Sequence, residues 1–194
     1  MFLLSKPSEQ AIRAFIEGQS RLQLTYPAVG ATAGDPPTGY VVDRTHVRLG
    51  SGKSVFEAGQ ATLLRREQFQ LGWIQLCWPN IPVEQDQVVA VLAHVCGLWS
   101  LNACRVVYVV NEQRRFGLAY GTLPAHAESG EERFTVERHE DNSVWYDILA
   151  FSRPHQVLSR LGYPLVRMLQ KRFARDSAAA MVRAVAQQIL RSPS

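Results

Sequence analysis

The sequence has few cysteines, no long apolar run and no leader-like start. Its three cysteines, Cys77, Cys96 and Cys104, form no Cys-x-x-Cys pair and no Cys/His spacing typical of zinc. We therefore expect buried, reduced thiols, a cytoplasmic location, and neither a metal nor another cofactor. The opening "MFLL" is too short for the apolar core of a signal peptide, and no apolar run approaches the roughly 18 residues of a membrane helix.

The charge balance is also moderate, and two catalytic motifs are incomplete. Lys and Arg number 21 against 17 Asp and Glu, a net charge of +4, which gives no strong nucleic-acid signal. "LGSGKS" (49–54) resembles a phosphate-binding P-loop, but Val47 stands where that motif needs its first glycine. The serine-hydrolase motif Gly-x-Ser-x-Gly is absent. Nucleotide hydrolysis and serine-based acyl transfer are therefore disfavoured.

What the sequence does contain is typical of one globular domain over residues 1–194, with 46% hydrophobic and 20% charged residues. Ser8 predicts the N-cap of an amphipathic helix reaching Leu22, with Ile12 on its apolar face. The Gly- and Pro-rich stretch 25–39 predicts an extended loop. We expect residues 1–38 to pack on the rest of the domain.

Segments rich in Val, Ile, Thr and aromatic residues predict seven strands. They are 39–50, 73–78, 87–95, 104–112, 115–123, 132–140 and 143–152. A helix capped by Ser54 separates the first two, and "RREQFQLG" after it can form a further short turn. "NEQRR" and "HEDNS" predict hairpin turns, so the last six strands should form a curved antiparallel sheet.

From Pro164 onward the apolar spacing becomes helical. We expect this long helix to cover the concave face of the sheet and to bury Leu165, Leu169 and Phe173. Its basic residues are Arg160, Arg167, Lys171, Arg172, Arg175, Arg183 and Arg191. They could form a phosphate- or lipid-binding face, but their interleaving with Asp176 and apolar residues is more typical of a solvated helix surface.

This α+β order resembles the helix-grip fold of START domains, pathogenesis-related class-ten proteins and polyketide cyclases. In that fold a seven-stranded antiparallel sheet wraps a long C-terminal helix. The N-terminal helix, the Pro-rich loop and the single helix after the first strand depart from the common pattern. The resemblance implies a cavity between the sheet and the last helix.

Several longer stretches together resemble one family. They are "LTYPAVGAT", "LGSGKSVFEAGQATL", "GLWSLNACRVVYVV", "RRFGLAYGTLPAHAESGEERFTVE", "VWYDILAFSRP" and "LGYP". The likeness runs from about residue 20 to the C-terminus, and the family is the uncharacterised bacterial and plant family called domain of unknown function 1990. The resemblance supports a single domain of helix-grip type and transfers no catalytic residue.

Three functions are consistent with this sequence. The first is binding of a small, largely apolar or amphipathic molecule in the cavity. The second is an enzyme of cyclase or hydrolase type that uses the same cavity, and the third is binding of an anionic membrane surface or nucleic acid by the last helix. The candidate ligand-binding residues are Tyr26, Trp99, Asn102, Arg105, Tyr108, Tyr120, His126, Glu128, Glu131 and Glu132.

The segment "GTLPAHAESGEE" (121–132) carries the sharpest expectation. His126 and Glu128 share a face of an extended chain, so they suggest an acid–base or metal pair, although loop carboxylates are usually solvated. Pro124 and Gly130 should interrupt strand pairing at the rim of the sheet. If Phe134 points inward, Glu132 does too and needs a buried partner, with Arg105 the first candidate; otherwise Glu131 is the buried carboxylate.

Overall fold

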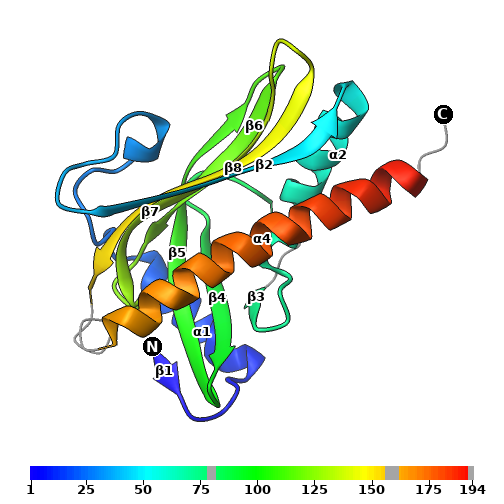
Figure 1. Ribbon diagram of the computed structural model, residues 1–194. Helices are drawn as coiled ribbons and strands as arrows, with labels where there is room; N and C mark the ends of the chain where they lie inside the picture. Colours follow the sequence, from blue (N-terminus) through cyan, green and yellow to red (C-terminus); the bar gives the residue numbers. More distant parts are fainter. Residues whose placement is uncertain (78–81, 156–161, 192–194) are drawn as a thin grey trace.

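The computed structural model describes residues 1–77, 82–155 and 162–191, and in these a curved antiparallel sheet wraps around one long helix (Figure 1). The sheet order is β2-β8-β7-β6-β5-β4-β3, with β1 paired to β5 outside this path. The strands are β1 (Phe2–Leu3), β2 (Val41–Ser51), β3 (Ile74–Leu76), β4 (Val88–Val95), β5 (Leu98–Asn111), β6 (Arg115–Thr122), β7 (Glu128–Arg138) and β8 (Ser143–Pro154). The seven-stranded helix-grip arrangement is confirmed, with β1 as an addition.

The helices are α1 (Glu9–Ser20), α2 (Lys53–Leu64) and α4 (Tyr163–Arg191), with short 3-10 turns η1 (Ala31–Ala33) and η2 (Glu67–Phe69). Ser8 caps α1 as predicted, because its hydroxyl accepts from the amide of Ala11 at 3.2 Å. The predicted Ser54 cap of α2 is wrong. That helix begins at Lys53, two residues earlier than expected, after Gly52, whose φ of 93° makes the turn without a side-chain cap.

The predicted hairpins connect β5 to β6 and β7 to β8. β5 begins at Leu98, six residues earlier than expected, because Cys96 and Gly97 both take positive φ and form a two-residue hairpin turn after β4. This turn exposes Cys96, so the expectation of three buried thiols holds only for Cys77 and Cys104.

Gly130 lies in β7, where the absence of a side chain lets the backbone of β8 approach closely. Pairing of β7 with β6 stops at Glu131, as the Pro124–Gly130 stretch predicted, but pairing with β8 continues to Glu128. A Cβ atom on Gly130 would lie 1.9 Å from the carbonyl oxygen of Phe151. Glu128, Glu131 and Glu132 therefore lie on a strand held between two neighbours, and only residues 123–127 form the connection.

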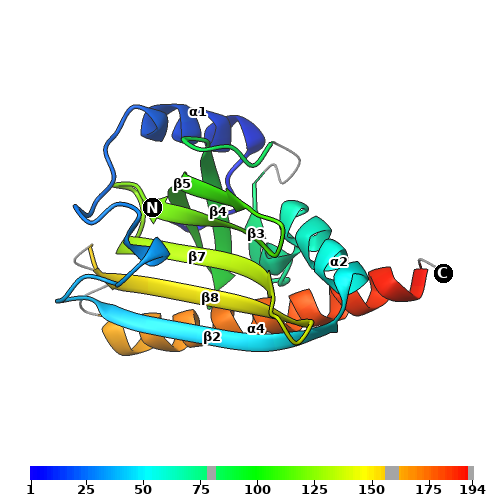
Figure 2. The same cartoon turned by 90° about the horizontal axis from the view of Figure 1, so that it is seen from above.

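The two faces of the sheet are covered by different parts of the chain. Figure 2 shows α1 and α4 on opposite sides of it. On the convex face Ile12 of α1 packs against Leu92 and Leu101 of β4 and β5. On the concave face the main core joins the strands to α2 and α4, with Phe134 and Met181 fully buried.

Helix α4 divides into two halves that differ in burial. Its buried residues are Ser177, Ala178, Ala180, Met181 and Val185, all in the second half, which contacts α2 and η2. In the first half Phe173 is only half-buried and Leu165 is 46% exposed, so the expected burial of Leu165 is wrong. The first half crosses an open part of the concave face and has less to pack against. Arg160 lies outside the described residues.

Candidate functional site

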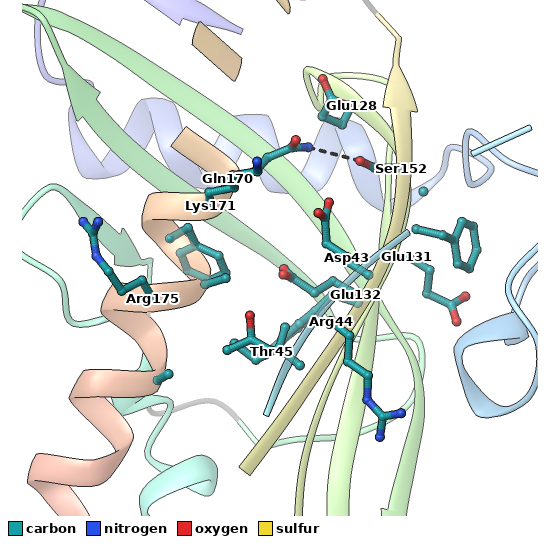
Figure 3. Close-up of a pocket in the computed structure, with 18 of the residues that line it drawn as sticks. Asp43, Arg44, Thr45, Glu128, Glu131, Glu132, Ser152, Gln170, Lys171 and Arg175 are labelled. Atoms are coloured by element: carbon teal, nitrogen blue, oxygen red, sulfur yellow. Dashed lines mark hydrogen bonds between the residues drawn. The ribbon is translucent and has the colours of Figure 1, made fainter. Parts of the chain in front are cut away.

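The adjacent glutamates Glu131 and Glu132 lie on opposite faces of β7. Phe134 is fully buried in the concave core, so the strand alternation directs Glu132 to the concave side and Glu131 to the convex side. In Figure 3 Glu132, Asp43 and Thr45 point toward α4, whereas Glu131 and Arg44 point away from it. The first of the two expected arrangements is therefore the one observed.

Glu131 holds the N-terminal loop on the convex face. One carboxylate oxygen accepts from the hydroxyl of Tyr26 and the amide of Gly30, each at 2.7 Å. The other accepts from the amide of Thr32 at 3.0 Å and from its hydroxyl, which also bonds the hydroxyl of Tyr108 at 2.7 Å. Tyr26, Tyr108 and Glu131 thus form a buried cluster that attaches the loop to the sheet.

Two pockets lie between the concave face and α4, with volumes of about 900 Å³ and 330 Å³. The larger is bordered by β2, β8 and the middle of α4. The smaller lies over β3, β4 and β5, under the start of α4, and its wall is mostly apolar. Both are lined by Cys104, Tyr120, His126, Glu132, Gln170 and Phe173, so they meet at this group.

Glu132 occupies the junction of the two pockets, directly opposite Tyr120 of β6. Removal from bulk water raises the pKa of its carboxyl group to about 8, and the nearby Asp43 adds to the rise. Within the described ranges no side chain or backbone group hydrogen-bonds to it. The expected pairing with Arg105 is wrong, because Arg105 lies on the convex face, where it donates to the carbonyls of Ser20 and Leu22.

His126 and Glu128 border the larger pocket at the start of β7, but they do not form the expected side-chain pair. The Nδ1 atom of His126 lies 3.0 Å from the backbone nitrogen of Glu128 and 3.2 Å from its carbonyl oxygen, so the ring contacts the backbone of Glu128. Burial lowers the pKa of His126 to about 4, so the imidazole is neutral. Burial also raises the pKa of Glu128 to about 7, partly offset by Ser152 and Arg167.

Helix α4 supplies the opposite wall of the larger pocket. Arg167 donates two hydrogen bonds to Asp43 of β2, at 2.6 Å and 2.7 Å, and Gln170 donates to Ser152 of β8 at 3.1 Å. These contacts join the helix to both strands at one end of the pocket. Lys171 and Arg175 line the same wall (Figure 3), and Arg175 also pairs with Asp176.

Of the ten candidate residues, six line the pockets: Asn102, Tyr120, His126, Glu128, Glu131 and Glu132, although the side chain of Glu131 points to the convex face. The structure places Trp99 on the convex face, where it stacks on His94 with ring centroids 4.2 Å apart. Sequence reasoning missed Asp43, Ser152, Gln170 and Arg167. Alternation in β2 puts Asp43 on the inward face, but nothing in the sequence links it to Arg167, 124 residues away.

The polar groups of this site are suited to recognition or proton transfer. No group of three His, Cys, Asp or Glu side chains positioned to hold a metal occurs in residues 1–77, 82–155 and 162–191. Glu132 is a carboxyl group held protonated at neutral pH, and the neutral imidazole of His126 lines the same two pockets. It can donate a hydrogen bond or a proton to a group in the pocket. Of the helices in those ranges, none is both long and apolar enough to cross a membrane.

Solved structures with this fold include an aromatase/cyclase. The Zhui aromatase/cyclase from Streptomyces sp. R1128 matches with a TM-score of 0.53 at 9% identity, covering 77% of this chain and 96% of that one. Hypothetical protein jhp0584 from Helicobacter pylori matches with a TM-score of 0.50 at 13% identity, covering 83% and 95%. These similarities establish the shared helix-grip fold.

The sequence relatives extend over nearly the whole chain. A UPF0548 protein of Dictyostelium discoideum is 32% identical over an alignment of 207 positions that covers 95% of this chain and 96% of that protein. A UPF0548 protein of Deinococcus radiodurans is 35% identical over 196 residues, with 95% and 98% covered. The model of the domain of unknown function DUF1990 matches residues 25–180. The chain therefore belongs to the DUF1990 family, as the resemblance of its sequence predicted.

Proposed function

We propose that this protein binds a small, largely apolar molecule between the sheet and α4. The observation that carries the proposal is that two pockets, of about 900 Å³ and 330 Å³, meet at the unpaired carboxyl group of Glu132. Ligand sites are typically concave and mostly apolar, with a few polar groups that orient the ligand. The smaller pocket supplies apolar wall, and Glu132, His126 and Asn102 supply the polar groups.

The residues proposed to bind the ligand are the candidates whose side chains face the pockets, together with Asp43 and Gln170. These candidates are Asn102, Tyr120, His126, Glu128 and Glu132. Tyr26, Tyr108 and Glu131 support the site from behind, because they fix the loop to the outside of the same strands. Trp99 and Arg105 are not part of the proposed site. The ligand is small and apolar or amphipathic.

A second candidate function is catalysis in the same place. The observation that favours it is the contrast between two groups that line the same pockets, since the pKa of Glu132 is raised to about 8 and that of His126 is lowered to about 4. Paired groups shifted in opposite directions are typical of acid–base sites. The match to an aromatase/cyclase fits this alternative only at the level of fold.

A bulky side chain introduced into the larger pocket tests whether a ligand binds there. Ala179 of α4 lines the larger pocket, whereas Ala186 lies two turns further along and is exposed. We expect wild-type protein purified from its cells to carry a small molecule detectable by native mass spectrometry. Ala179→Phe should abolish that mass difference, and Ala186→Phe should retain it. Retention by Ala179→Phe, or a ligand-free wild type that binds no apolar probe such as diphenylhexatriene, contradicts the proposal.

A further inference from the structure

We propose that the carboxyl group of Glu132 donates a hydrogen bond to a carbonyl-type oxygen of an uncharged ligand, positioned where the two pockets meet. This rests on the proposed function and names the class of ligand: an apolar molecule with a ketone or similar acceptor oxygen. The apolar part lies in the smaller pocket, and the acceptor oxygen faces Glu132.

The geometry leaves Glu132 with a free hydrogen-bonding group aimed into the hollow. Its carboxyl group points toward α4 from the middle of β7 (Figure 3). It keeps some surface only because it faces the pockets. Within the part of the chain that the structure describes, no donor or acceptor reaches it. A buried polar group without a partner is costly, so a ligand that satisfies it gains specificity.

The groups facing Glu132 from the sheet favour the uncharged carboxyl. Tyr120 lies directly opposite on β6, and Cys104 of β5 lines the same junction. Burial raises the pKa of Tyr120 to about 12 and that of Cys104 to about 12, so both are neutral. Tyr146 of β8 is buried and protonated as well. Asp43 of β2 is already paired with Arg167, and its negative charge disfavours ionisation of Glu132.

The groups on the remaining elements do not neutralise Glu132 either. His126 is neutral, and Glu128 at the rim is another carboxyl group. Arg66, which is buried just after the end of α2, lowers the pKa of Tyr120. Lys171, Arg175 and Arg183 line the α4 wall, but none of them forms an ion pair with Glu132. A neutral acid in a pocket of this kind is a hydrogen-bond donor at pH 7.

The same surroundings disfavour charged ligands. An anionic group at the junction would meet Glu132, Asp43 and Glu128 from the sheet side. A cationic group would have to pass Lys171 and Arg175 and would need Glu132 ionised. An uncharged molecule meets neither penalty, and its acceptor oxygen supplies the carboxyl group of Glu132 with a hydrogen-bond partner.

The test uses three fluorescent probes of the pocket. Prodan is an uncharged naphthalene with a ketone, diphenylhexatriene is an uncharged hydrocarbon, and its trimethylammonium derivative is a cation. Each is titrated into wild-type protein, Glu132→Gln, Glu132→Leu and the convex-face control Glu137→Gln. Glutamine keeps a donor but does not titrate, whereas leucine removes the donor at similar size. Thermal unfolding checks that every variant is folded.

We expect prodan affinity to fall about tenfold in Glu132→Leu at pH 6.5, with little change in Glu132→Gln or Glu137→Gln. Diphenylhexatriene should bind all four proteins within about twofold of one another. In wild type, prodan affinity should fall as the pH rises through about 8, and in Glu132→Gln it should not. Bound prodan should also emit at longer wavelength in wild type than in Glu132→Leu, because its carbonyl accepts a hydrogen bond.

Two results overturn the inference while leaving the proposed function intact. One is hydrocarbon binding with prodan affinity unchanged in Glu132→Leu. The other is tighter binding of the cationic probe as Glu132 ionises, which would make the site one for amines. If none of the three probes binds wild-type protein, the proposed function fails together with the inference.

Discussion

At the scale of single residues, two neighbouring glutamates of β7 have opposite roles. Glu131 accepts four hydrogen bonds from the N-terminal loop, whereas Glu132 accepts none within the described ranges. The difference arises from the side of the sheet each one faces. On the convex side a loop supplies amide and hydroxyl donors to the carboxylate of Glu131. On the concave side the carboxyl group of Glu132 faces the pockets, where the described part of the chain supplies no such donors.

We predict that Glu131→Gln lowers the free energy of unfolding by about 2–4 kcal/mol. The neutral amide is a weaker acceptor, and its NH2 group would face the backbone amide of either Gly30 or Thr32, which is itself a donor. Chemical denaturation measures this change. Glu137→Gln, half-exposed on the same strand and the same face, should cost less than about 0.5 kcal/mol. Equal effects for the two variants would show that the loop is not held by Glu131.

The raised pKa of Glu132 predicts how stability depends on pH. Its folded-state value of about 8 exceeds the ordinary 4.5, so the folded protein binds more protons than the unfolded chain between these values. Stability from this group is therefore lost as the pH rises through that window. Glu132→Gln removes the loss.

Relative to wild type, Glu132→Gln should gain stability between pH 5 and pH 9, on the order of 1 kcal/mol or more. Denaturation at a series of pH values measures the difference. His126 has the opposite dependence between about 4 and 6.5, but it is present in both proteins and cancels. A constant difference between the two proteins across this range would mean that Glu132 titrates normally.

At the scale of elements, α4 has a supporting half and a pocket-lining half. Met181 is fully buried in the second half, whereas Phe173 in the first packs on Phe69 and Phe134 and has one side open to both pockets. We predict that Met181→Ala costs about 2–4 kcal/mol of unfolding free energy and Phe173→Ala less, about 1–2 kcal/mol. The reverse order, measured by denaturation, would place the core of the helix in its first half.

Strand β7 depends on a glycine for its close contact with β8. Alanine at Gly130 would place a Cβ atom within 1.9 Å of a backbone carbonyl, which cannot rotate away. We predict that Gly130→Ala costs at least about 2 kcal/mol, measured as a shift in the denaturation midpoint. Gly18 in α1 has open space around it, so Gly18→Ala should stabilise the protein slightly. A neutral Gly130→Ala would contradict the observed strand spacing.

At the scale of the whole molecule, the basic residues of α4 do not form one uncompensated face. Arg167 is paired with Asp43, and Arg172 and Arg175 with Asp176. Arg172 also lies over the ring of Trp73, 4.5 Å from its centroid. These pairings leave less positive charge for an anionic partner than the sequence suggests.

We therefore predict little binding to vesicles that contain anionic lipid at about 0.15 M salt, measured by co-sedimentation. Any binding at low salt should be weak and should disappear as salt rises. The double variant Lys171→Glu with Arg191→Glu, which leaves the ion pairs intact, serves as the control. Strong binding of wild type that this variant loses would favour the membrane or nucleic-acid alternative over the pocket.

Features that depend on neighbouring residues could be predicted from the sequence. Ser8 marked the start of α1, the hairpin turns set the antiparallel order, and alternation in β7 placed Glu131 and Glu132 on opposite faces. The long helical spacing after Pro164 marked the covering helix. Periodicity and turn chemistry act over a few residues, so they can be read without the fold.

Which groups meet across the fold could be seen only in the three-dimensional structure. Arg105 was expected beside Glu132 and instead binds loop carbonyls on the other face, and Asp43 meets Arg167 from 124 residues away. The sequence also could not show that the first half of α4 crosses open pockets while the second half is buried. Such contacts depend on the curvature of the sheet and on where distant segments cross it. No local pattern of residues encodes either, because both emerge from the packing of the whole chain.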